Sequence, residues 1–132
     1  MLLDDVSEGF RSYRQWREKR GRRHEEGEYS LLTSGVVRTL ALALKDQCVG
    51  VRETASGILG KVGQPEGMIA LDELVLAARD SEPNVKTLAV WALGRLGPEA
   101  CPKGTKVLIA GMRDSYWKVR TAACISVSNM GA

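Results

Sequence analysis

The chain has 132 residues, of which 44% are hydrophobic, 27% charged and 5% aromatic, and 19 basic against 16 acidic side chains give a net charge of +3. This is the composition of one ordinary globular domain, and the charge is too small to indicate nucleic-acid binding by itself. A single histidine excludes most hydrolytic and metal chemistries that depend on histidine. Three cysteines, an odd number without the spacing of a zinc site, favour a reducing intracellular compartment.

Residues 1–29 predict an amphipathic helix followed by a polar loop. The helix is expected over residues 3–20, with acidic residues early and basic residues late, as the helix dipole favours. Its apolar stripe consists of Leu3, Val6, Phe10 and Tyr13. The loop covers Gly21–Gly27, where His24 is expected to be solvated. Three interpretations stay open: a helix that caps the repeats described next, a basic element for an acidic partner or RNA, and a flexible flank. Seven basic and seven acidic side chains in this segment argue against the basic element.

From about residue 31 the chain repeats itself with a shift of 34 residues and no gap. Six columns of identical or similar residues carry the repeat. They begin at Asp46, Val51, Arg52, Ala55, Leu40 and Gly63, and the first of them continues as Asp80 and Asp114. We therefore expect three repeats, at about 30–63, 64–97 and 98–131.

Each repeat predicts two helices. In the middle repeat, apolar residues from Leu71 to Ala78 form one helical face, Asp80–Pro83 interrupts it with Asp80 or Ser81 as a helix cap, and a second face follows. That second face consists of Val85, Leu88, Ala89, Ala92, Leu93 and Leu96. The same pattern predicts helices near 33–45 and 49–62, and near 103–113 and 117–130. Period-two alternation is absent, so we expect an all-α fold without strands.

A helix pair leaves an apolar face open on each side, and only stacking on neighbours closes it, so the pattern favours an α-solenoid. Gly60 and Gly94 recur late in the second helix, where glycine costs about 1 kcal/mol relative to alanine. We expect the backbones to approach closely there.

The repeated motif is Asp46-x4-Val51-Arg52-x2-Ala55-x2-Ile58-Leu59-Gly60-x-Val62-Gly63, with copies that begin at Asp80 and Asp114. It closely resembles the HEAT repeat, in the short form also found in phycobilin lyases, over about 100 of the 132 residues. The resemblance implies a scaffold or adaptor. It also implies a ladder of ion pairs between neighbouring repeats, in which Asp46, Asp80 and Asp114 meet Arg52, Lys86 and Arg120. Lys86 departs from the arginine pattern, so its rung is expected to be looser.

The second helices of HEAT-like arrays line a concave surface, which here predicts a groove. In the middle repeat, Asn84, Thr87, Trp91 and Arg95 lie opposite the core face, and the neighbouring repeats add Lys61 and Lys118. These six residues are our candidates for partner binding. Trp91 has two interpretations: an interface residue beside Arg95, or a packing residue that fills the space above Gly57.

We therefore expect a non-catalytic protein-interaction or scaffold module, without a catalytic residue, cofactor, metal or membrane span. Two alternatives stay open: an enzyme-associated subunit such as one of a bilin lyase, and a weak nucleic-acid-binding surface. The chain stops within a closing repeat motif without a polar last helix, so we expect part of a longer array, with self-association through an exposed C-terminal edge of Ile125, Val127 and Met130. The location is expected to be the cytoplasm, and the style of the sequence would also fit a ciliary or sperm protein of vertebrates.

Overall fold

A computed structural model describes the backbone of residues 26–131 and the side chains of residues 34–131. Within that range the chain forms six α-helices and two short 3-10 helices, and no strand. The elements are α2 (Glu26–Ala43), α3 (Val49–Val62), η1 (Glu66–Ala70), α4 (Leu71–Ala77), α5 (Pro83–Leu96), η2 (Gly97–Ala100), α6 (Thr105–Met112) and α7 (Trp117–Gly131). The all-α prediction is confirmed. The helix expected over residues 3–20 and His24 lie outside the described residues.

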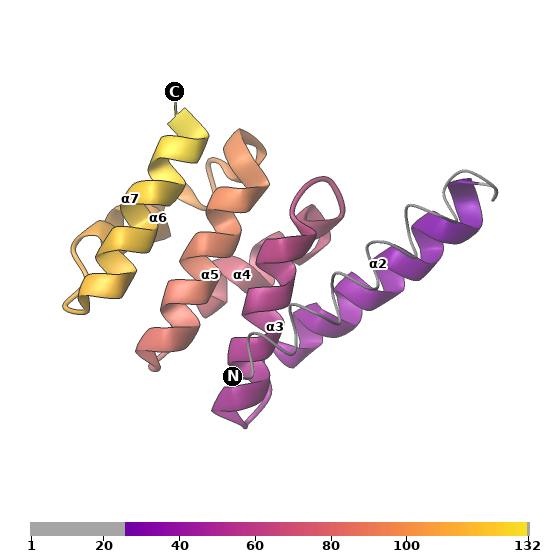
Figure 1. Cartoon of the computed structure of the whole chain (residues 1–132), viewed down its shortest axis with the longest axis horizontal. Coiled ribbons are helices and arrows are strands. Elements are labelled where there is room, and N and C mark those ends of the chain that lie inside the picture. Colours follow the sequence, from indigo (N-terminus) through magenta and orange to yellow (C-terminus); the bar gives the residue numbers. More distant parts are fainter. Residues whose placement is uncertain (1–25, 132) are drawn as a thin grey trace.

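The helices pair as the repeat predicts, in the order α2–α3, α4–α5 and α6–α7 (Figure 1). The second helices α3, α5 and α7 stand side by side and pack directly on one another, whereas α4 and α6 contact mainly their own partners. Close packing on one side and wide spacing on the other place the second helices on the inner side of the array.

One element boundary differs clearly from the sequence prediction. The first helix begins at Glu26 rather than near residue 33, so the last two residues of the expected loop, Glu26 and Gly27, are helical. In the later repeats the first helix is short, because a 3-10 turn precedes it after a glycine with positive φ. Gly63 (φ 59°) and Gly97 (φ 75°) end α3 and α5 in this way, in a conformation that only glycine adopts without strain.

The core follows the predicted second-helix face. Val85, Ala89, Ala92, Leu93 and Leu96 are fully buried, whereas Leu88 of the predicted face is only partly buried and Val90, which was not predicted, is fully buried. Burial is complete where a repeat has a neighbour on both sides. It is lost at the ends of the described array, where Val51 is 39% and Val127 37% exposed.

Leu93→Ala is expected to lower the free energy of unfolding by about 2–5 kcal/mol, because it removes a large buried side chain from a close-packed site. Its counterpart Leu59→Ala should behave alike, since both leucines are fully buried. Urea unfolding measures the effect. The control is Leu76→Ala, at a position 61% exposed, which should stay within about 0.5 kcal/mol of wild type. Neutral behaviour of both core variants would contradict the assigned helix faces.

Candidate functional site

The three aspartates of the predicted ladder occupy the same kind of turn. In each case one carboxylate oxygen accepts a hydrogen bond from the backbone N–H two residues on: Cys48 N–H to Asp46 at 2.8 Å, Glu82 N–H to Asp80 at 2.9 Å and Tyr116 N–H to Asp114 at 2.9 Å. The aspartates therefore stabilise the turn that precedes each second helix. Neither Asp80 nor Ser81 is the helix N-cap, since Glu82 occupies that position in α5.

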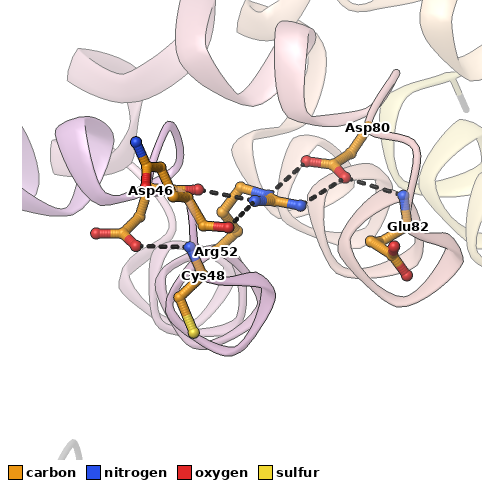
Figure 2. A network of polar contacts seen from close by, with 6 residues as sticks. Asp46, Cys48, Arg52, Asp80 and Glu82 are labelled. Atoms are coloured by element: carbon orange, nitrogen blue, oxygen red, sulfur yellow. Dashed lines mark hydrogen bonds and ion pairs between the residues drawn. The ribbon is translucent and has the colours of Figure 1, made fainter.

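Arg52 joins the first repeat to the second (Figure 2). Its Nε donates to Asp80 Oδ2 at 2.9 Å and its Nη2 to Asp80 Oδ1 at 3.4 Å. Its Nη1 donates to the backbone carbonyls of Asp46 and Gln47 at 2.8 and 3.2 Å. The planar guanidinium thus holds its own turn with one edge and the next repeat's carboxylate with the other, a geometry that lysine cannot reproduce.

Lys86 makes the next rung with a single contact, from its Nζ to Asp114 Oδ2 at 2.6 Å. The hydrogen bond from Lys86, followed by that from the Tyr116 N–H, lowers the pKa of Asp114. Lys86 does not bind the carbonyls of its own turn as Arg52 does. Lys86 therefore makes fewer hydrogen bonds than Arg52, and this is the difference between the two rungs.

The third expected cation, Arg120, binds its own turn as Arg52 does but does not bind a carboxylate of a following repeat within the described residues. Its Nη1 donates to the carbonyls of Asp114 and Ser115 at 2.9 and 3.0 Å, but no carboxylate within residues 34–131 meets its other edge. At the opposite end, Asp46 meets no cation in the same range. The ladder therefore has two rungs in the described array and an open position at each end.

The candidate binding residues are spread along the second helices. Asn84, Arg95 and Lys118 are exposed, while Lys61, Thr87 and Trp91 are partly buried. None of the three cations among them forms an ion pair with a described carboxylate. Lys118 Nζ lies 5.7 Å from the centroid of the Trp117 ring, within cation–π distance.

The indole of Trp91 packs across the boundary between the first two repeats. A Cβ built on Gly60 would overlap the Trp91 ring atoms Cζ3 and Cε3, so the glycine makes room for the indole. Arg95 Nε adds a long hydrogen bond of 3.4 Å to the Gly60 carbonyl. The contact with Gly60 favours the packing role of the two interpretations of Trp91.

Gly94, the counterpart of Gly60, serves a closer backbone approach. An added Cβ there would lie 2.7 Å from Ser126 Cα on α7. The buried Ser126 hydroxyl donates to the Val90 carbonyl at 2.8 Å. The expectation of close backbone contact is thus confirmed for Gly94, whereas at Gly60 a side chain occupies the space.

The described residues hold no group of three or more His, Cys, Asp or Glu side chains that could bind a metal ion. Cys48, Cys101 and Cys124 are free and exposed. No helix in the described part of the chain is long and apolar enough to cross a membrane.

Residues 71–132 match the family model for HEAT repeats. These residues belong to the HEAT-repeat family. The matched region covers the second and third helix pairs, and the α2–α3 pair continues the same 34-residue register as a further HEAT repeat. No curated protein matches the chain.

Three contacts between the HEAT repeats had no counterpart in the sequence prediction. Ser126 bonds Val90, Lys103 bonds Asp72 at 2.9 Å, and Gln64 Nε2 donates to the Leu96 carbonyl and, at 2.7 Å, to Glu99. Each involves a residue that differs between copies, such as Gln64 with Pro98 as its counterpart. A comparison of the copies finds only recurring residues, so it gave no signal for them.

Gly60→Ala is expected to lower the free energy of unfolding by about 1–3 kcal/mol, because the new methyl group displaces the Trp91 indole. In a Trp91→Ala background the same change should be neutral or stabilising, since the obstacle is gone and alanine favours the helix. The matched control is Gly35→Ala in α2, where nothing lies within 4 Å, and a gain of about 0.5–1 kcal/mol is expected. Urea unfolding of this double-mutant cycle gives the coupling. Additive effects would contradict the packing role.

The Lys86–Asp114 rung predicts a pH dependence of stability. The folded-state pKa of Asp114 lies below its ordinary value of 3.8, so its contribution is present above pH 4 and is lost as the pH falls through the folded-state pKa. Asp114→Asn should therefore be less stable than wild type at pH 7, and the difference should shrink between pH 4 and pH 2. Urea midpoints across this range measure it, with Asp46→Asn as the control at the same turn position without a paired cation. A difference that stays constant with pH would refute the assignment.

Proposed function

We propose that the chain is a non-catalytic protein-binding scaffold whose partner lies across the second helices. HEAT repeats are generally protein-interaction scaffolds, and the fold sets α3, α5 and α7 side by side on the inner side of the array. The observation that supports this surface most directly is its set of cations that pair with no described carboxylate, Lys61, Arg95 and Lys118. Arg52 and Lys86, on the same helices, each have a carboxylate partner, whereas Lys45, Lys106 and Arg113 outside the second helices also lack one among the described residues and serve below as the control.

The cations favour a partner segment that is acidic. Lys61 and Arg95 occupy the same column of consecutive repeats, so a chain crossing α3 and α5 near their C-terminal ends would meet both. Lys118 lies at the beginning of α7, in the column of Asn84. Thr87 and the exposed edge of Trp91 lie between these charges and would supply a hydroxyl and an apolar contact. Charge complementarity of this kind acts mainly on specificity and the rate of association.

Three free, exposed thiols also support an intracellular location, because such thiols persist in a reducing compartment. The bilin-lyase alternative has no supporting contact among the described residues. The nucleic-acid alternative shares the cations with the proposed function, so the same experiment has to separate them.

The triple variant Lys61→Glu, Arg95→Glu, Lys118→Glu should lose partners that the wild-type chain retains on an affinity column. Binding of a retained acidic partner, measured by calorimetry, should weaken at least tenfold, or about 1.4 kcal/mol. The matched control is Lys45→Glu, Lys106→Glu, Arg113→Glu, which makes the same charge change at exposed positions outside the second helices. Equal retention by both variants would refute the proposed surface. Nuclease-sensitive retention with a steep salt dependence would favour the nucleic-acid alternative instead.

We also propose self-association through the C-terminal edge. Ile125 is 51% exposed, and Val127 is 37% exposed although its counterparts Leu59 and Leu93 are fully buried by the repeat that follows them. A second copy would cover this apolar surface. Sedimentation should show a dimer at high concentration for the wild type and a monomer for Ile125→Ser, Val127→Ser. A strictly monomeric wild type would refute this.

A further inference from the structure

The first repeat carries an apolar groove that no described residue covers. It has a volume of about 390 Å³ and lies between α2 and α3. Its lining includes Leu40, Ala43, Cys48, Val51, Thr54 and Ile58. Beyond its rim on α2, Val36 is 44% exposed, one turn before Leu40 and seven residues before Ala43. Together these three residues form an apolar stripe on the helix.

The counterparts of this groove are stacking surfaces in the later repeats. Leu74 and Leu108, which correspond to Leu40, are 0% and 2% exposed. Val85 and Val119, which correspond to Val51, are 0% and 1% exposed. A Cβ built on Gly111 would contact both Val119 and, from the preceding repeat, Val90, each at 3.7 Å. This surface therefore faces the preceding repeat in the later repeats, and in the first described repeat no described residue packs on it.

We propose that residues 3–20 of the same chain form a helix that occupies this groove, antiparallel to α2. A second copy of the repeat would not fit the sequence there. Arg52 and Lys86 each lie 28 residues before the aspartate with which they pair. The residue 28 positions before Asp46 is Glu18, where a further repeat would need a cation. A like charge at that position argues against a further repeat and for a different helix.

The length of the segment fits the groove. A helix over residues 3–20 and α2 over Glu26–Ala43 have the same number of residues, about 27 Å each, and residues 21–25 separate them. If the chain reverses there, residue i lies level with residue 46 − i. Leu3 then lies level with Ala43, Val6 with Leu40 and Phe10 with Val36. The apolar stripe of the segment therefore meets the apolar stripe of α2 and the groove beside it.

The charges of the two helices also match in this arrangement. Glu8 lies level with Arg38, and Asp4 and Asp5 lie near the end of α2, close to Lys45. Arg38 and Lys45 are exposed, and neither pairs with a described carboxylate. Arg20 likewise lies level with Glu26, while Glu18 lies level with Glu28 as the one like-charged alignment, and the antiparallel helix dipoles attract. The segment is thus an intramolecular cap, an inference that does not depend on the partner surface proposed above.

Disulfide trapping tests this arrangement, with native Cys48 as the thiol in the groove. In a Cys101→Ser, Cys124→Ser background, a cysteine is introduced as Leu3→Cys, and under mild oxidation it should form an intramolecular bond with Cys48. The matched control Lys19→Cys lies at the far end of the segment and should react at least tenfold more slowly, because a disulfide needs Cα atoms within about 7 Å. Non-reducing electrophoresis and mass spectrometry of the linked peptides measure both rates.

The rate for Leu3→Cys should not change with protein concentration. Adding Glu8→Lys should slow it several-fold, and adding Arg38→Glu to that variant should restore it. Equal rates for Leu3→Cys and Lys19→Cys, or no bond in either, would overturn the proposal. Bonds formed mainly between chains would overturn it in favour of a second copy in the groove. Circular dichroism on each variant checks that the helical array is retained.

Discussion

Contact between consecutive second helices is the constraint on which the other features of this array depend. A pair of helices as short as α6 and α7 cannot enclose its own apolar residues, so each repeat completes its core with the next. Leu59 and Leu93 are fully buried for this reason, whereas Val127 at the same position of the last described repeat is not. The requirement explains why small residues recur in the contact. Gly94 allows the Ser126 backbone of α7 to approach, and the serine hydroxyl then bonds the Val90 carbonyl.

The ladder of ion pairs has a different role from the apolar contact, and magnitudes separate the two. Burial of a leucine side chain contributes about 1.5–3 kcal/mol, while a partly exposed ion pair contributes about 0–1 kcal/mol. The rungs therefore add little to the stability that burial provides. Their geometry instead fixes the register, because Arg52 binds its own turn and the next repeat's Asp80 with two edges of one rigid group. The bonds to its own turn hold the guanidinium in place, so a slip of one repeat along the other would break its bonds to Asp80.

Recurrence of residues predicted the helix pairs, the core face and the ladder, because each of these features depends on a contact that every repeat makes. Features specific to one repeat were missed. The start of α2 at Glu26 was not predicted, since Gly27 and the charges around it favour a loop by local propensity. The contact of Trp91 with Gly60 was not predicted. Helical spacing gives the face on which a residue lies but not its height relative to the neighbouring helix, and that height depends on how α5 is shifted against α3.

The same comparison between copies bears on which second-helix residues are free to bind a partner. A column that varies without a packing reason is available for function, whereas variation that packing explains is not. Trp91 stands in a column with Gly57 and Ile125, but the room that Gly60 leaves for the indole accounts for it. Lys61 and Arg95 occupy a column that Asn129 continues, and no described carboxylate pairs with either cation. Arg95 is exposed, and its Nε donates only a long hydrogen bond to the Gly60 carbonyl. Its guanidinium is therefore a better candidate for the centre of a partner contact than the neighbouring indole.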